Sequence, residues 1–233
     1  MKLYYDLHIH TCLSPCASNE NLPSDVVGMA IVNKLDVIAI TDHNSSKNCR
    51  AAVAWAKAHA PDMIVLCGME LTTSEEVHVL CLFAELGEAE KFAKMVYKHI
   101  PYIKCDEKIF GHQLVVDEND AVIEKEEKML LAGTDISIEG LRQLVESYGG
   151  AVVPAHVDRD SMSLISNLGS IPPEYGFKAI EIRHAENKYL PFYGLKLFDS
   201  DAHQLAQIGR HKKFLQCKEK TAHAVISLLR NGA

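Results

Sequence analysis

Short apolar runs alternate with amphipathic stretches along most of the chain. Runs typical of strands buried on both faces lie at residues 3–8, 36–40, 63–67, 77–83, 151–154, 178–182 and 195–198. Helical periodicity begins near residues 22 and 137 and covers 47–59 and 88–99, and a strand at 214–216 and a helix at 221–230 close the chain. This alternation predicts an α/β fold with a parallel sheet, and about seven units suit a barrel better than an open sheet.

Residues 101–136 interrupt this alternation. The segment is irregular, and residues 117–128 are dense in charge. It could form a hairpin and a short helix that lie over a functional site, or a solvated excursion. No internal repeat or low-complexity tract is present, so we expect a single domain over residues 1–233.

Composition narrows the class of protein. The chain is 48% hydrophobic and 24% charged, as in ordinary globular proteins, and its net charge of −7 argues against a general nucleic-acid binder. We therefore expect no stable nucleic-acid partner. Seven scattered cysteines do not form a disulfide framework, and neither a secretion signal nor a membrane-spanning run is visible. These features favour a cytoplasmic location, with reduced thiols and no membrane association.

Histidines and carboxylates gather near the apolar runs. His8 and His10 alternate at the end of the first run, so their rings point the same way from an extended chain, on the face opposite Leu3, Tyr5 and Leu7. The other candidates of this kind are His43, Glu70, His78, His156, Asp201 and His203. In a barrel, groups at the carboxyl ends of the strands meet at one face. Imidazole with carboxylate suits zinc, manganese or iron, and this many ligands implies two or three divalent metals.

With these residues collected, the chain resembles the PHP (polymerase and histidinol phosphatase) family of metal-dependent phosphoesterases. The matching motifs appear in family order: Asp6-Leu7-His8-Ile9-His10, Thr41-Asp42-His43-Asn44, Gly68-Met69-Glu70, Val77-His78-Val79-Leu80, Pro154-Ala155-His156 and Ser200-Asp201-Ala202-His203. The first and last motifs are specific together, whereas His78 and His156 are placed mainly by their order. The resemblance implies a distorted (β/α)7 barrel with a metal site at the carboxyl ends of its strands.

The resemblance also implies ligands for up to three metals. The first metal would take His8, His10 and Asp201, the second His78 and His156, and the third His43 and His203, with Glu70 bridging the first two. The ninth family ligand, usually His or Asp, stands six residues after the second histidine of the opening motif. Cys16 occupies that position here. Cys16 is therefore either a ligand of the third metal or an ordinary small residue.

The activity that the resemblance implies is hydrolysis of a phosphoester by a hydroxide that bridges two metals. Glu70 and Asp201 would hold that centre. Arg159 and Arg183 follow the runs at 151–154 and 178–182, so each could clamp a phosphate bidentately or pair with a surface acid. The expected substrate is a small phosphorylated metabolite or nucleotide.

Two other functions stay open. Amidohydrolase barrels, which hydrolyse C–N bonds, also open with His-x-His, but they usually carry a bridging carboxylated lysine in the role that Glu70 takes here. A non-catalytic, metal-stabilised PHP module would normally lack several ligands, whereas only Cys16 departs from the pattern.

Overall fold

The computed structural model describes residues 1–184, 191–192 and 194–232. The strands are β1 (Lys2–Ile9), β2 (Val37–Ile40), β3 (Ile64–Thr72), β4 (His78–Phe83), β5 (Leu114–Val116), β6 (Val122–Lys125), β7 (Ala151–Pro154), β8 (Ala179–Glu181), β9 (Leu195–Leu197) and β10 (Lys213–Gln216). The helices are α1 (Pro23–Val32), α2 (Cys49–His59), α3 (Leu86–His99), α4 (Glu107–Phe110), α5 (Leu141–Ser147), α6 (Leu164–Leu168) and α7 (Ala222–Asn231), with 3-10 turns η1 (Pro173–Tyr175) and η3 (Leu205–Gln207). No helix in this described part combines the length and apolar character needed to cross a bilayer.

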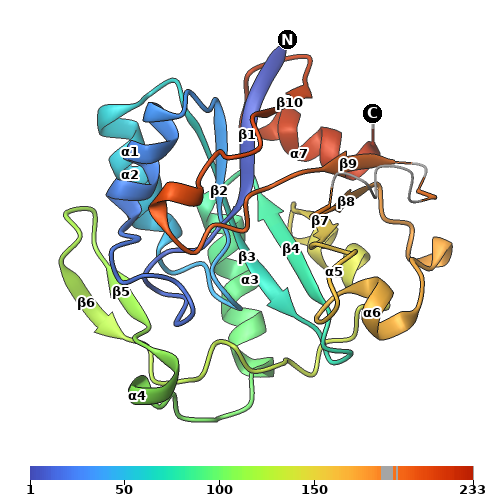
Figure 1. Cartoon of the computed structure of the whole chain (residues 1–233), viewed down its shortest axis with the longest axis horizontal. Coiled ribbons are helices and arrows are strands. Elements are labelled where there is room, and N and C mark those ends of the chain that lie inside the picture. Colours follow the sequence, from blue (N-terminus) through green and yellow to red (C-terminus); the bar gives the residue numbers. More distant parts are fainter. Residues whose placement is uncertain (185–190, 193, 233) are drawn as a thin grey trace.

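The largest sheet has six strands in the order β10-β1-β2-β3-β4-β7. β1, β2 and β3 are parallel, and the helices that connect them, α1 and α2, lie together beside the sheet (Figure 1). Ile38 and Ile40 of β2 pack in the core shared with α1, α2 and α3, whereas Val37 and Ala39 pack in the core that includes α7. Both faces of β2 are therefore buried, which explains its continuous apolar run.

The direction of β4 differs from the parallel arrangement predicted from the sequence. β3 extends beyond the expected end of its run to Thr72, and β4 returns antiparallel to it, with Thr72 opposite His78. Only residues 73–77 separate the two strands, and a parallel crossover needs about a dozen residues or more. Gly68 permits their close approach, because a Cβ at this position would lie 2.6 Å from the carbonyl oxygen of Cys81. β7 is antiparallel to β4 and so runs parallel to β3.

The sheet curls so that its far end returns toward β1. β8 and β9 form a separate parallel pair, and the Val157 N–H, just after β7, donates to the carbonyl oxygen of Glu181 in β8. After β9, the Ala202 N–H donates to the carbonyl oxygen of His8 at 3.1 Å, and the His10 N–H donates to that of Ala202 at 2.9 Å. The result is an α/β fold with a curled, half-barrel sheet of mixed strand direction.

The segment 101–136 forms a hairpin, β5–β6, and a short helix, α4 (Figure 1). This was one of the two arrangements expected for it. The segment is anchored to the body of the protein: the Leu114 N–H donates to the carbonyl oxygen of Cys12, and the Val116 N–H donates to the side chain of Asn48. These bonds anchor β5, whereas all four residues of β6 are exposed.

Candidate metal centre

The carboxylate of Glu70 is the point at which the candidate ligands meet. Glu70 is 1% exposed, and its nearest imidazole nitrogen is Nδ1 of His78, 2.8 Å from Oε1. The imidazoles with a nitrogen within 3.4 Å of its two oxygens belong to His8, His10, His43, His78 and His156. A single carboxylate thus contacts side chains from residue 8 to residue 156, as a bridging ligand would.

Asp201 extends this group across the seam between β1 and the chain that follows β9. Its Oδ1 lies 3.4 Å from Nε2 of both His8 and His10, and 3.5 Å from Nδ1 of His203. A parallel bridge between Ile9 and Ala202 brings the two segments together. The two alternating motifs at opposite ends of the sequence therefore form one site.

The strand directions explain why these ligands share one edge of the sheet. β1, β2, β3 and β7 run the same way, so the residues at their carboxyl ends meet. His78 stands at the start of β4, but the antiparallel turn brings that start to the same edge. His78, which the sequence analysis placed by motif order, therefore reaches this edge because β4 is antiparallel to β3.

The β1–β2 register shifts between Asp6 and Ile9, next to the two histidines that contact Glu70. Leu7 packs in the core that includes α7, whereas Ile9 packs in the opposite core, so the alternation changes where the β1–β2 register shifts. His8 and His10 both contact Glu70, as the shared-face prediction requires.

Three of the eight described non-glycine residues with positive φ lie at this edge. Asn44, His156 and Asp201 are non-glycine residues with φ of 48°, 28° and 50°. Such conformations cost about 1–3 kcal/mol each and cluster at functional sites. Two of these residues are candidate ligands, and Asn44 directly follows a third, His43.

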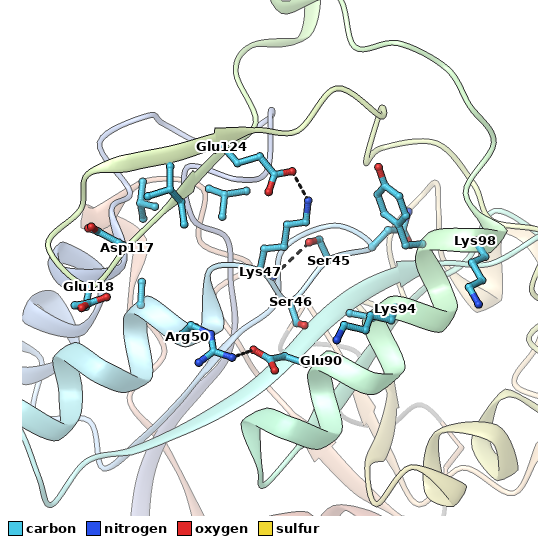
Figure 2. Close-up of a pocket in the computed structure, with 17 residues that line it drawn as sticks. Ser45, Ser46, Lys47, Arg50, Glu90, Lys94, Lys98, Asp117, Glu118 and Glu124 are labelled. Carbon is cyan, nitrogen blue, oxygen red and sulfur yellow. Dashed lines mark hydrogen bonds and ion pairs between the residues drawn. The ribbon is translucent and has the colours of Figure 1, made fainter.

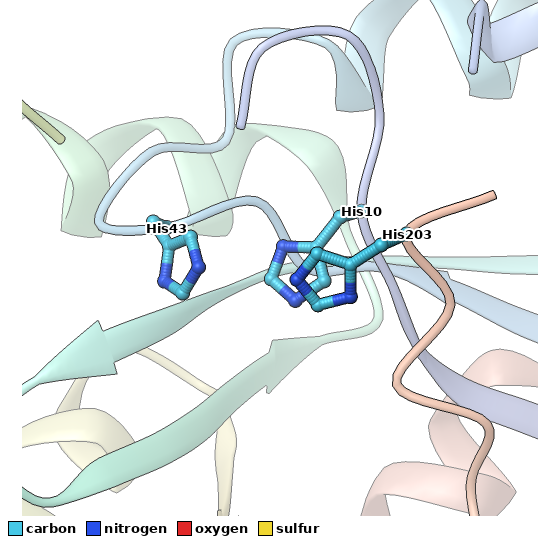
Figure 3. A group of neighbouring side chains, drawn as sticks. All are labelled: His10, His43 and His203. Atoms are coloured by element: carbon cyan, nitrogen blue, oxygen red, sulfur yellow. The ribbon is translucent and has the colours of Figure 1, made fainter. Parts of the chain in front are cut away.

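The described residues contain three groups whose ligand atoms lie within 4.8 Å of one another. The groups are His8, His10 and Asp201; His43, Glu70 and His78; and His10, His43 and His203. Figure 3 shows the third group, with His203 beside His10 and His43 facing them from the other side. The ring centroid of His10 is 4.4 Å from that of His203 and 4.6 Å from that of His43. Shared members make the three groups one continuous cluster.

Two buried nitrogens test whether this cluster fits metal ions. Nδ1 of His43 and Nδ1 of His78 lie 3.1 Å and 2.8 Å from Glu70 oxygens, yet neither makes a hydrogen bond with any described residue. A buried polar atom left without a hydrogen bond is costly. Nitrogen and carboxylate oxygen that converge without bonding to each other are arranged as two ligands of one cation. The residues present therefore fit divalent metals that accept imidazole and carboxylate.

The pKa shifts of Glu70 and His43 favour the protonation states that bind metal. For His8, in contrast, burial disfavours the charged form, but the carboxylates of Glu181, Glu70 and Asp201 outweigh burial and raise the pKa. Burial raises the pKa of Glu70, but the imidazoles of His78, His8 and His43 outweigh burial and hold this pKa well below its usual range. Burial lowers the pKa of His43 well below its usual value. An ionised carboxylate and a neutral imidazole are the forms that ligate cations.

Asp42 supports the cluster through Ser14. The Ser14 hydroxyl donates to Asp42 Oδ1 at 2.6 Å, and its oxygen lies 3.0 Å from Nδ1 of His10. Thr11 donates to the same carboxylate through its N–H and its hydroxyl, both at 2.7 Å. Asp42 thus fixes the ring of His10 indirectly, which leaves Nε2 of His10 facing Glu70 and Asp201.

Glu181 is a site residue that the sequence analysis missed. It is 2% exposed, its Oε2 lies 2.8 Å from Nδ1 of His8, and its Oε1 accepts from the His156 N–H at 3.3 Å. The sequence did contain a sign of this role: Glu181 is a carboxylate inside the apolar run 178–182, where a charge without a partner would be costly to bury.

The two candidate arginines reach the cluster, and Cys16 does not join it. Arg159 and Arg183 each place Nη1 3.9 Å from Oδ2 of Asp201. Cys16 belongs to none of the three groups formed by the described residues, and its surface is exposed. Its thiol is nevertheless desolvated and near Glu70 and Asp201, and these effects raise its pKa to about 12.

Comparison with known proteins agrees with this geometry. The PHP domain model matches residues 6–161. Asp201 and His203 lie beyond the match, so their place in the cluster comes from the structure. No curated protein matches the sequence significantly.

Several solved structures share the fold at low sequence identity. The lesion-specific endonuclease Q of Pyrococcus furiosus has a TM-score of 0.66 and 16% identity over 99% of this chain and 56% of its own. A two-domain protein from Bacteroides vulgatus containing a predicted PHP-like metal-dependent phosphoesterase gives 0.59 and 16%, over 99% of this chain and 63% of its own. An amidohydrolase from Chromobacterium violaceum, with bound sulfate, gives 0.58 and 16%, over 93% of both chains. The chain spans little more than half of endonuclease Q.

The expectation of no nucleic-acid partner is overturned by these similarities. An endonuclease Q complex with a 27-mer duplex substrate, which has an abasic lesion at the active site, matches with a TM-score of 0.66 and 17% identity over 99% of this chain and 57% of its own. A net charge of −7 was a poor guide, because a phosphate group responds to the local field. That field is set by nearby arginines and by bound cations rather than by the sum over the chain.

Proposed function

Because the chain belongs to the PHP domain family, we propose that it is a metal-dependent hydrolase that cleaves a phosphoester. The observation that carries this proposal is the position of Glu70, whose two oxygens are shared among five imidazoles. A carboxylate in this position can hold two cations at the separation that in-line displacement at phosphorus requires.

The ligand sets of the proposed centre follow from the contacts. His8, His10 and Asp201 would hold one cation, His78 and His156 a second, and Glu70 would bridge the two, at the carboxyl ends of the strands of a distorted (β/α)7-type barrel. His43 and His203 would hold a third, and Cys16, which lies outside the three groups, would become a further ligand only if its side chain turned toward them. Zinc, manganese and iron all accept these donors. Bound there, such cations lower the pKa of water toward neutrality and neutralise phosphoryl charge.

The protein's own groups would orient the substrate. Arg159 and Arg183 stand on the Asp201 side of the cluster and are about 40% exposed, so their guanidinium groups can reach a phosphate that approaches from solvent. Glu181 and Asp42 would hold His8 and His10 in fixed tautomers, with Nε2 free for a cation. The proposed substrate is a phosphorylated metabolite or nucleotide, and a DNA phosphoester is the alternative that the endonuclease Q similarity favours.

Hydrolysis of a C–N bond is the second candidate function. The fold of the Chromobacterium violaceum amidohydrolase supports it. Glu70 would take the bridging role that a carboxylated lysine takes in amidohydrolase barrels, and two arginines beside Asp201 suit a phosphoryl group better than an amide. We therefore rank phosphoester hydrolysis first.

All seven cysteines are free in the structure, which supports a reducing, cytoplasmic location as part of the proposal.

A panel of substrates tests the proposed reaction. Protein reconstituted with zinc, manganese or iron is assayed with p-nitrophenyl phosphate, bis(p-nitrophenyl) phosphate, an abasic-site duplex and p-nitroacetanilide. We expect phosphoester turnover that falls about 100-fold or more in Asp201→Asn and is unchanged in His223→Ala, a control on α7 outside the cluster. Turnover of the anilide alone would establish the second candidate. Inactivity on the whole panel at full metal occupancy would favour a non-catalytic module.

A further inference from the structure

We propose that a cavity between α2, α3 and the β5–β6 hairpin is a second small-molecule site, which takes an organic anion with an apolar body. The cavity has a volume of about 850 Å³, and none of the clustered histidines, Glu70 or Asp201 lines it. Ligand sites in proteins commonly enclose about 300–1,000 Å³. This inference does not depend on the reaction proposed for the metal centre.

Three elements build the cavity (Figure 2). α2 and the loop before it contribute Ser45, Ser46, Lys47, Arg50 and Ala51. α3 contributes Glu90, Ala93, Lys94, Tyr97 and Lys98, and the hairpin contributes Val115, Val116, Asp117, Glu118, Ile123 and Glu124. Asn44, directly after His43, also lines the cavity, and its N–H donates to the carbonyl oxygen of Glu70 at 2.9 Å.

The apolar part of the lining suits an aromatic or aliphatic body. Val115 and Val116 are at most 5% exposed, and Ala51 is 2% exposed. Ile123 lines the cavity from the hairpin and is 65% exposed. Apolar surface left in water in this way is unfavourable in free energy. A ligand in the cavity would remove part of that apolar surface from water.

The charges around the cavity favour an anion near α3. Lys47 is paired with Glu124 and Glu126 at 2.6 Å, and Arg50 is paired with Glu90. The positive charges of Lys47 and Arg50 are thus neutralised by neighbouring acids. Lys94 and Lys98, one turn apart on α3, have no ion-pair partner among the described residues.

The acids of the hairpin that form no ion pair with any described residue, Asp117 and Glu118, lie at the opposite end of the cavity from Lys94 and Lys98 (Figure 2). Asp117 accepts the N–H groups of Asn119 and Ala121 within its own turn, and Glu118 lies beside it at the hairpin end of the cavity (Figure 2). Figure 2 shows Lys94 extending from α3 toward Ser46, whose buried hydroxyl also lines the cavity. A negatively charged head beside Lys94, with its apolar body against Val115 and Val116, satisfies both parts of the lining.

Two fluorescent probes that differ in charge test this site. Anilinonaphthalene sulfonate carries an anionic group, and N-phenyl-1-naphthylamine is its neutral counterpart. Each is titrated into wild-type protein, Ala93→Phe, Lys94→Glu and the matched control Lys91→Glu. Lys91 lies on the same helix and is exposed but does not line the cavity. Ile109→Ser reports on the rival exposed apolar surface at α4, where Ile109 is 72% exposed.

We expect saturable sulfonate binding that Ala93→Phe abolishes and that Lys94→Glu weakens about fivefold or more, because charge reversal replaces attraction with repulsion. Lys91→Glu and Ile109→Ser should leave it within about twofold. The neutral probe should bind more weakly than the sulfonate, and its affinity should be unchanged in Lys94→Glu. Equal weakening by Lys94→Glu and Lys91→Glu, or loss of binding in Ile109→Ser alone, would overturn the proposal. If Ala93→Phe does not fold, the two lysine variants still decide it.

Discussion

At the scale of single residues, Glu181 connects the two sides of the metal cluster. Its carboxylate contacts the ring of His8 and the backbone N–H of His156, two groups that approach Glu70 from different strands. A carboxylate on the far nitrogen of a metal-ligating imidazole fixes its tautomer and increases its basicity. Glu181 is therefore a positioning residue for the proposed ligands.

Replacing Glu181 with Gln should weaken metal binding about 10- to 100-fold. The amide keeps the volume of the side chain but loses the charge that holds the proton on Nδ1 of His8. Competition with a chelating dye measures the affinity. Glu124→Gln, at an exposed acid on β6, is the control and should bind metal as the wild type does. Equal affinities in both variants would show that Glu181 is only a structural residue.

Cys16 is the one ligand position at which the chain departs from the family pattern. If Cys16 is a ligand, Cys16→Ala should lose one metal equivalent, and Cys16→Asp should keep it with a preference shifted toward manganese, because oxygen donors suit harder cations. Elemental analysis after reconstitution with a zinc–manganese mixture measures both effects. Cys105→Ala removes a thiol distant from the cluster in sequence and serves as the control. An unchanged metal count in Cys16→Ala would exclude a ligand role.

The eight conventional ligands were predictable because each is a histidine or carboxylate next to a buried run, where such side chains need partners. The structure brings all eight together around Glu70 and Asp201. Glu181 escaped prediction because it belongs to none of the motifs that carry the family resemblance. The bond from Ser14 to His10 escaped because a hydroxyl has no distinctive signature in sequence.

At the scale of elements, the runs predicted where strands lie but not which way they point. β7 matches its expected bounds and β2 begins one residue later than expected, since bulky apolar residues mark both strands. The β3–β4 pair was wrongly expected to be parallel, although the expected connection at 68–76 is already shorter than a parallel crossover needs. The irregularity in β1 could not be predicted, because it arises from pairing with β2 and from the core around Leu7 and Ile9.

Gly68 tests the close contact between β3 and β4. Gly68→Ala should lower the free energy of unfolding by about 1–3 kcal/mol, since its Cβ would overlap the Cys81 carbonyl oxygen unless the strands shift. Gly28→Ala is the matched control: nothing lies within 4 Å of its Cβ position in α1, so it should stabilise by about 0.5–1 kcal/mol. Denaturant unfolding measures both. A Gly68→Ala protein as stable as the wild type would contradict the described packing.

At the scale of the whole molecule, the cluster ties together segments that are distant in the sequence. Its members run from His8 to His203 and include the seam at which the chain after β9 returns to β1. A cation bound there stabilises the folded chain by linkage, because the unfolded chain does not preassemble these ligands.

Metal should therefore raise the melting temperature. At a free metal concentration of about 100 times Kd, linkage adds about 2.7 kcal/mol, or roughly 5–10 °C for a chain of this length. Calorimetry with and without a chelator measures the shift. Glu70→Gln should show a much smaller one, since it lacks the proposed bridge. An equal shift in both proteins would mean that the metal binds elsewhere.

The number of metals per chain, measured by elemental analysis after reconstitution with manganese or zinc, tests the central claim most directly. A cluster bridged by Glu70 predicts at least two metals in the wild-type protein. It also predicts a larger loss of metal in Glu70→Gln than in His78→Ala or His156→Ala, because a bridging carboxylate serves two cations and each histidine serves one. Fewer than one metal per wild-type chain, or a Glu70→Gln protein that retains the full count, would contradict the account.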